Sequence, residues 1–264
     1  MENENLIRLG VFLGLFTVLA VIETIAPRRA RPVARGSRWM TNWGITIANT
    51  LTMRILAIAL PLLAVGAAID AGRAEIGLLH LVDWPAWVEI TLAIVFFDFA
   101  IWFQHMITHK IPLLWRLHRV HHSDRDLDVT TAIRFHPLEI ALSMIIKIGL
   151  VYALGPAAIA IIMFEIILNG TAMFNHANIR IPDRLERAIR WVLVTPDMHR
   201  VHHSVDRHEH DSNYGFALSI WDRLFGTYIA QPKLGHDGMT IGLQWQDTGP
   251  LKLGWSLWLP FRRK

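Results

Sequence analysis

The chain has 264 residues, of which 53% are hydrophobic and 18% charged, and it contains 11 Trp and no Cys. The low charged fraction and the mean hydropathy of +0.33 favour a membrane protein. Without cysteine the chain can form no disulfide, iron–sulfur cluster or thiolate-bound haem. The pI of about 9.8 is compatible with a nucleic-acid partner. Because the basic residues cluster beside apolar stretches, where they bind lipid headgroups, we expect no nucleic acid.

Apolar stretches long enough to cross a bilayer recur along the chain. Three predict single spans, and the last two predict a helical hairpin that turns at Gly155-Pro156. The spans are expected near residues 6–26, 43–66, 86–107, 138–153 and 157–174.

An arginine-rich loop sets the expected topology. Five Arg and no acidic residue lie between positions 28 and 38, whereas residues 70–85 hold one Arg and three acids. The positive-inside rule then places the Arg-rich loop, the end of the third span and both ends of the hairpin in the cytoplasm. We therefore predict one domain over residues 1–264: an all-α integral membrane helical bundle with a cytoplasmic cap built from residues 108–137 and 175–264. A multi-pass protein of a bacterial inner membrane is the expected setting.

Histidines form three clusters, each beside an apolar stretch. The first has the spacing His-x-x-x-His, and the other two share the pattern His-Arg-Val-His-His-Ser. Residues i, i+3 and i+4 of a helix share one face, so all rings of one cluster can point to one place. Neutral imidazole is a good ligand for Zn, Cu, Fe and Ni, and eight imidazoles suit two metal ions better than one. The eight are His105, His109, His118, His121, His122, His199, His202 and His203.

The residues around these clusters resemble the fatty acid hydroxylase/sterol desaturase superfamily of integral membrane enzymes. The resemblance runs from about Asp98 to Tyr228, and it includes Trp115-Arg-Leu-His118, Thr195-Pro-Asp-Met-His199 and Trp221-Asp-Arg-Leu-Phe-Gly-Thr-Tyr228. It implies hydroxylation or desaturation of a lipid C–H bond by O2 at a His-rich centre of two iron ions. Zinc, which lies above iron in the affinity order, can replace iron in purified protein.

The resemblance also implies a ligand at His176, directly after the hairpin. Fatty-acid hydroxylases often carry another His four residues earlier, where this chain has Ala172, so the number of ligands stays open. His136 precedes Pro137, as in some sterol-desaturase relatives, and is either a ligand or a structural residue. The other histidines are expected outside the ligand set. His208 and His210 should be solvated or lie beside the ligands, and His80 and His236 should lie at the surface.

Charged residues inside the spans need partners, because a lone charge in a bilayer costs several kcal/mol. Asp98 lies seven residues before His105 and shares its helical face, so it either supports that ring or pairs with Arg54. Lys147 and Glu165 lie at similar distances from the Gly155-Pro156 turn, on antiparallel arms. We therefore predict a direct ion pair between Lys147 and Glu165.

The expected substrate is a membrane lipid, a sterol, a fatty acyl chain or a related molecule. No G-x-G-x-x-G fingerprint for NAD or flavin occurs. We therefore expect a separate electron donor, a ferredoxin or a cytochrome b5-like carrier with its reductase, for which a basic cytoplasmic face can provide the docking surface. The alternative function is a zinc-dependent membrane lipid hydrolase, in which the metal activates water.

Overall fold

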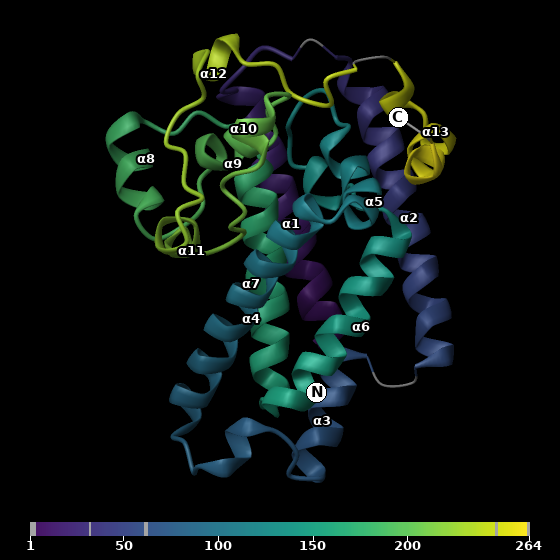
Figure 1. Ribbon diagram of the computed structural model, residues 1–264, viewed down its shortest axis with the longest axis vertical. Coiled ribbons are helices and arrows are strands. Elements are labelled where there is room, and N and C mark those ends of the chain that lie inside the picture. Colours follow the sequence, from purple (N-terminus) through teal and green to yellow (C-terminus); the bar gives the residue numbers. More distant parts are fainter. Residues whose placement is uncertain (1–3, 32, 61–62, 246–247, 263–264) are drawn as a thin grey trace.

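A computed structural model describes residues 4–31, 33–60, 63–245 and 248–262 of the chain. Within these residues every regular element is helical, and β pairing is limited to three isolated bridges. Long helices form a stem, and short helices gather in a cap at one end of it, together with the C-terminus (Figure 1). The predicted all-α bundle with a cap is confirmed.

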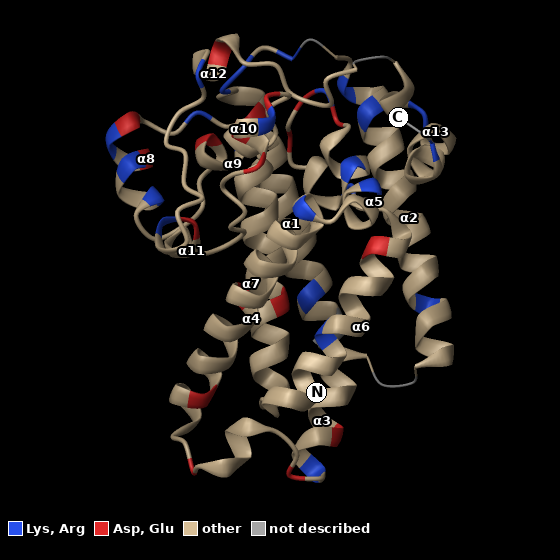
Figure 2. Ribbon diagram, viewed as in Figure 1, with Lys and Arg blue, Asp and Glu red and all other residues tan. Residues whose placement is uncertain are grey.

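Five stretches of the stem are long and apolar enough to cross a membrane. Four match predicted spans: α1 (Glu4–Ile25), α4 (Ala86–Lys110), α6 (Pro137–Leu154) and α7 (Ala158–His176). Large apolar side chains on these helices remain exposed, as on helices that face lipid; Val18, Trp87 and Ile145 are examples. Charged residues crowd the cap and are sparse along the middle of the stem (Figure 2).

The predicted second span, residues 43–66, is wrong as a single helix. The chain forms α2 (Arg35–Ala59) and then a separate α3 (Ala64–Arg73) that packs against α6 and α7. The sequence contains the reason, because Pro61 follows Leu60, and a residue before proline avoids the helical conformation. Four alanines of α3 are buried, and small side chains allow such close packing of helices. The predicted loop from residue 70 therefore begins only after Arg73.

The turn of the predicted hairpin is confirmed. Gly155 caps α6 with a left-handed φ of 67°, and α7 begins at Ala158. Gly77 lies against this turn, and a Cβ added there would meet the Gly155 nitrogen at 2.3 Å. The hairpin tip thus rests on the segment that leads into η1 (Leu78–Leu81), and neither glycine tolerates a side chain.

The cap consists of short helices that follow the stem helices in sequence. They are α5 (Pro112–His122), η2 (Thr131–Ile133), α8 (Asp183–Arg190), α9 (Pro196–His202), α10 (Arg207–His210), α11 (Ile220–Leu224), α12 (Gly235–Gly238), η3 (Gly249–Leu251), α13 (Leu253–Trp258) and η4 (Leu259–Phe261).

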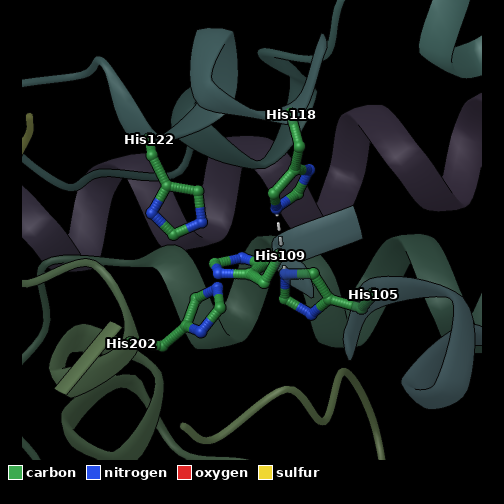
Figure 3. Close-up of side chains that lie close together, drawn as sticks. All are labelled: His105, His109, His118, His122 and His202. Atoms are coloured by element: carbon green, nitrogen blue, oxygen red, sulfur yellow. Dashed lines mark hydrogen bonds between the residues drawn. The ribbon is translucent and has the colours of Figure 1, made fainter. Parts of the chain in front are cut away.

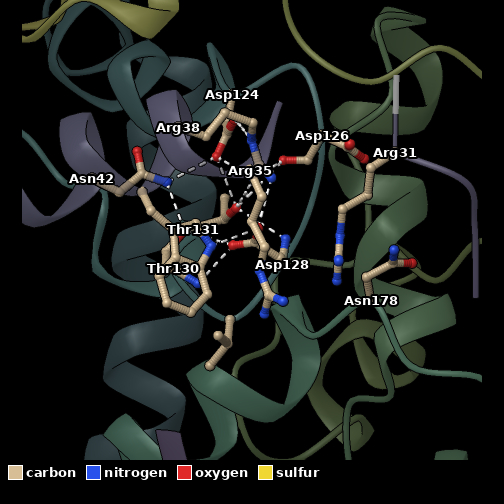
Figure 4. Close-up of polar contacts among 12 residues, drawn as sticks. Arg31, Arg35, Arg38, Asn42, Asp124, Asp126, Asp128, Thr130, Thr131 and Asn178 are labelled. Carbon is tan, nitrogen blue, oxygen red and sulfur yellow. Dashed lines mark hydrogen bonds and ion pairs between the residues drawn. The ribbon is translucent and has the colours of Figure 1, made fainter. Parts of the chain in front are cut away.

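A buried ionic network ties α2 to the segment after α5 (Figure 4). The Arg38 guanidinium donates to Asp124 Oδ1 and to Asp128 Oδ2, each at 2.7 Å, and all three side chains are almost fully buried. The neighbouring guanidiniums of Arg38 and Arg134 lower the pKa of Asp124 to about 2, against the opposing effect of burial. Removing one partner of such a buried pair is strongly destabilising, so this network holds the segment after α5 against α2.

The Arg-rich loop was expected to bind lipid headgroups, and the structure gives most of it other partners. Besides the pairs of Arg38, Arg31 and Arg35 form ion pairs with Glu23, at 3.2 and 3.3 Å. Glu23 also accepts hydrogen bonds from the backbone of Val129 and Asn178. The loop therefore fastens the top of α1 to the cap.

The structure also tests the predictions for charges in the spans. Lys147 Nζ lies 2.8 Å from Glu165 Oε1, which confirms that ion pair. Both readings of Asp98 are wrong, because its carboxylate accepts hydrogen bonds from Trp221 Nε1 and from the backbone of Leu218. Arg54 is exposed on α2. Asp98 therefore anchors a cap loop to α4, a contact across more than a hundred residues of chain.

Candidate metal centre

Nine buried histidines meet where the stem joins the cap, in two groups. In each group the ring nitrogens that could serve as ligands all lie within 4.8 Å of one another. The first group draws on α4, α5 and α9, and its five rings converge (Figure 3). It contains His105, His109, His118, His122 and His202. The second contains His121, His176, His199 and His203.

The two His-Arg-Val-His-His clusters each divide between the groups. The first and last rings of the α5 cluster, His118 and His122, belong to the first group, whereas His121 belongs to the second. In the cluster of α9 the pattern is reversed, since only His202 crosses to the first group. The spacing allows all rings of one cluster to point to a single place, but the structure divides them. Each cluster bridges both groups, which holds them side by side.

This exchange gives the two groups similar sets of contributing residues. The helix α4 adds the i, i+4 pair His105 and His109 to the first group, and α7 adds His176 to the second. The position on α7 that completes a matching pair, four residues before His176, is Ala172. Ala172 accordingly explains why the second group has four histidines and the first has five.

Hydrogen bonds orient several of the rings. The Nδ1 atoms of His105, His176 and His202 each lie 2.7 Å from a backbone carbonyl oxygen, those of Tyr214, Ala172 and Ser212 respectively. His118 Nδ1 lies 2.6 Å from Glu139 Oε1. A ring that donates through Nδ1 presents the lone pair of Nε2, the arrangement typical of metal-binding histidine.

The remaining nitrogens fit bound cations. His105 Nε2 and His118 Nε2 lie 3.0 Å apart, as do His121 Nε2 and His176 Nε2. Several other buried ring nitrogens, including both of His109, have no hydrogen-bond partner among the described residues. Burial and the neighbouring imidazoles hold the pKa values of five rings on or directly after α5 and α9 well below the ordinary range, those of His121, His122, His199, His202 and His203. Neutral imidazoles with converging lone pairs are what divalent metals bind.

The structure places the other histidines outside both groups. His136 caps α6: its Nδ1 accepts from the Leu138 backbone, and its Nε2 lies 3.1 Å from the Leu257 carbonyl oxygen. Of the two readings for His136, the structure favours the structural one. His80 and His208 are exposed, as predicted, and His210 lies beside His109.

The prediction that His236 lies at the surface is wrong. It is buried, and its Nε2 lies 3.7 Å from Asp197 Oδ2. Burial lowers the pKa of His236 to about 4. The sequence around it, a Gly- and Asp-containing turn, gave no sign that the chain folds back onto α9 here.

Sequence reasoning missed the residues that hold the first group in place. Glu139 was not singled out, although it contacts His118. Asp222 accepts hydrogen bonds from the backbone of Tyr214 and Gly215 and from Trp102 Nε1, and so positions the carbonyl that orients His105. Burial raises the pKa of Asp222. The position of Asp222 inside the quoted Trp-Asp-Arg-Leu-Phe-Gly-Thr-Tyr motif was the available signal.

Two cavities reach the first group. One of about 400 Å³ extends from His105 and His118 down between α1, α2, α4, α6 and α7, with mostly apolar walls. The other, about 330 Å³, lies on the cap side and touches His109 and His122. Its wall includes Trp115, whose ring stacks on His210, and the basic residues Lys110 and Arg207. The centre is therefore reached from the stem and from the cap by chemically different routes.

Comparisons with known proteins show which family the chain belongs to. Residues 90–227, just over half of the chain, match the family model described as fatty acid hydroxylase. An alkylglycerol monooxygenase of Xenopus tropicalis is 29% identical over 60% of this chain and 33% of its own length. Ornithine lipid hydroxylase OlsE of Rhizobium tropici is 29% identical over 69% of this chain and 53% of its own length. The human alkylglycerol monooxygenase is also 29% identical, over 62% of this chain and 36% of its own length. The chain thus spans between a third and about half of these relatives, and no solved structure matches it.

Proposed function

We propose a function from the premise that this chain belongs to the fatty acid hydroxylase family, which the match over residues 90–227 establishes. The chain is an O2-dependent di-iron oxidoreductase that hydroxylates or desaturates a C–H bond of a membrane lipid. The names of its relatives, alkylglycerol monooxygenase and ornithine lipid hydroxylase, support lipid oxidation. The single observation that carries the proposal is the pair of buried histidine groups at the end of a largely apolar cavity.

The proposed ligand set is the two groups of the structure. One ion is held by the five histidines of the first group and the other by the four of the second, and His136 is not included. This set lacks the Glu-x-x-His arrangement of soluble di-iron bundles. Zinc occupies the same sites when iron is scarce, because imidazole binds both metals and favours zinc.

The protein's part in the reaction is to orient the lipid, exclude water and fix the rings. Two bound iron ions supply the activation of O2 and the removal of hydrogen from an unactivated C–H bond. In a hydroxylation one oxygen atom enters the C–H bond and the other leaves as water, with two electrons from the donor and two protons. The apolar wall of the cavity, with Ile101, Phe135 and Phe216 among its residues, keeps the lipid chain next to His105 and His118.

Electrons for this reaction come from a separate donor in this proposal, a ferredoxin or a cytochrome b5-like carrier with its reductase. The cap-side cavity supports this, because Lys110 and Arg207 lie at its wall and an acidic carrier is attracted to such a surface. The cap and the C-terminus then lie in the cytoplasm, and we place the protein in a bacterial inner membrane. The Arg-rich loop at the cap end of α1 and α2 supports this orientation.

The deciding experiment measures metal content, oxygen use and lipid products together. Purified protein is expected to hold two metal ions per chain and to consume O2 only when loaded with iron and supplied with electrons. Mass spectrometry of lipids from cells with and without the protein should show a mass change of about +16 for hydroxylation or about −2 for desaturation, the expected shifts for these two reactions. A zinc-loaded protein that cleaves lipid without O2 would instead establish the hydrolase.

A further inference from the structure

The cavity that reaches His105 and His118 has charged residues at its other end. Its wall there includes Arg8 of α1, Lys147 of α6 and Glu165 of α7. Between the two ends the wall is mainly apolar. A purely hydrocarbon substrate gives no reason for charged groups in such a wall, and charges inside spans mark function by default.

These three side chains form one ionic cluster. Lys147 Nζ lies 2.8 Å from Glu165 Oε1, and the Arg8 guanidinium pairs with Glu165 Oε2. The side chains of Lys147 and Glu165 are 13% and 8% exposed, so both are nearly buried yet border the cavity. Each oxygen of Glu165 thus has its own cation.

Sharing one carboxylate leaves Lys147 able to bind another acceptor. An ammonium group has three donors, and the hydrogen bond to Glu165 uses one of them. Lys147 also lies 5.9 Å from the centre of the Phe164 ring, a contact that uses no donor. Because Lys147 borders the cavity, a ligand there can approach its remaining donors.

We propose that this end of the cavity binds the carboxylate of a single-chain lipid acid, with Lys147 as its principal contact, and that this contact determines which carbon reaches the metal centre. The inference rests on the proposed function and specifies its substrate. A monoanionic carboxylate suits the site, because Glu165 shows that the same cations bind that group. An acid anchored here extends its chain toward His105 and His118.

The fold gives an approximate length for the substrate. Glu139, which contacts His118, lies eight residues before Lys147 on α6, and eight residues of helix rise about 12 Å. An extended chain covers this distance in about ten bonds, since three backbone-type bonds span about 3.6 Å. Oxidation is therefore expected about ten bonds from the carboxylate, far along the hydrocarbon chain.

Binding without turnover tests this inference. Zinc-loaded protein in phosphatidylcholine nanodiscs is titrated with radiolabelled dodecanoate and with its methyl ester, at pH 8. The acid is expected to bind about tenfold or more tightly than the ester, the size of one charge-assisted hydrogen bond. Lys147→Met should abolish this preference, Lys147→Arg should retain it, and Lys252→Met, at an exposed position in the cap, should leave it unchanged.

The possible outcomes separate this inference from the proposed function. Equal binding of acid and ester by the wild-type protein, or an acid preference that survives Lys147→Met, would overturn the carboxylate site and leave the oxygenase proposal standing. If the protein binds no metal but still prefers the acid, the oxygenase proposal would be overturned and the carboxylate site would stand. In active iron-loaded enzyme, dodecanoate and tetradecanoate should be oxidised at the same distance from the carboxylate. Oxidation at a fixed distance from the methyl end would contradict the inference.

Discussion

Glu139 Oε1 lies 2.6 Å from Nδ1 of His118, and this contact joins the first turn of α6 to the histidine cluster of α5. A carboxylate that accepts from the distal nitrogen of a ligand ring fixes the tautomer and raises the basicity of the ligand. The pair therefore couples a stem helix, which borders the mostly apolar cavity, to the first histidine group.

Replacing this carboxylate should weaken metal binding at the first group. For Glu139→Ala we expect the affinity for metal to fall about 10- to 100-fold, the usual effect of losing such a partner. The affinity of Glu139→Gln for metal should fall less, because an amide oxygen can still accept a hydrogen bond from His118. Competition with a chelator, followed by metal analysis, measures the change. Glu75→Gln at an exposed position is the control, and a wild-type affinity in Glu139→Ala would refute the role assigned to this residue.

Single ligand substitutions should affect the two groups differently. His121→Ala removes one of four rings from the second group, and His202→Ala removes one of five from the first. We expect both variants to lose turnover, and His121→Ala to lose close to one metal ion per chain, whereas His202→Ala retains more of its metal. His80→Ala should change neither turnover nor metal content, because His80 is exposed. Substantial activity in His202→Ala would show that the ligand assignment is wrong.

The sequence predicted which histidines gather at one place, but not which of the two groups each one joins. The spacing i, i+3 and i+4 identifies His118, His121 and His122 as neighbours on one helix, because helical periodicity is local. The group to which each ring belongs depends on how α5 and α9 lie against each other, and that packing joins residues about eighty positions apart. Local spacing therefore identified the histidines that gather here but could not assign them to two groups.

The same limit explains the other differences. The partners of Asp98 are Leu218, just before α11, and Trp221 within it, more than a hundred residues later, so no pattern near Asp98 revealed them. The Lys147–Glu165 pair was predictable because a tight turn relates the two helices by simple counting. The end of α2 was also predictable, because the apolar stretch contains Pro61 and a residue before proline avoids the helical conformation. Contacts close in sequence were predictable, and contacts made by the cap were not.

Ala172 offers a gain-of-ligand experiment. It lies four residues before His176 on α7, at the place that matches His105 relative to His109 on α4. Ala172→His should add a ring to the second group and slow the loss of metal to a chelator, since metal binding and folding are coupled. Ala172 also borders the mostly apolar cavity, so a larger side chain there should block the proposed lipid substrate. Ala172→Leu separates the two effects: it should reduce lipid binding without slowing metal loss. Equal metal loss in Ala172→His and Ala172→Leu would contradict the proposal that a ring at position 172 joins the second group.

Membrane topology can be measured independently of activity. A reporter fused after Lys264 should be cytoplasmic, and one inserted next to Gly72, at the far end of α3, should be external. The physical reason is the charge asymmetry between the Arg-rich loop and residues 70–85. An external C-terminus would place the metal centre beyond the reach of cytoplasmic electron donors.

Asp126 predicts a specific pH dependence of stability. Burial, with the nearby carboxylates of Asp124 and Asp128, raises the pKa of Asp126 from 3.8 to about 6, although the Arg38 guanidinium opposes the shift. A carboxyl whose pKa is higher in the folded state contributes stability below its unfolded pKa, and this contribution is lost as the pH rises through about 6. At neutral pH the charge therefore destabilises the fold, by up to roughly 3 kcal/mol. Asp126→Asn should then be more stable than the wild type at pH 8, and its advantage should shrink as the pH falls toward 5.

Thermal unfolding of both proteins in nanodiscs across this range measures the difference. Other titrating groups and metal release affect the two proteins equally, so only the difference between them is interpreted. Asp183→Asn, at an exposed position at the start of α8, should track the wild type at every pH. A constant difference between Asp126→Asn and the wild type from pH 5 to 8 would mean that Asp126 stays ionised in the folded protein. The Arg38 network would then stabilise the ionised carboxylate of Asp126 enough that this charge does not destabilise the folded protein.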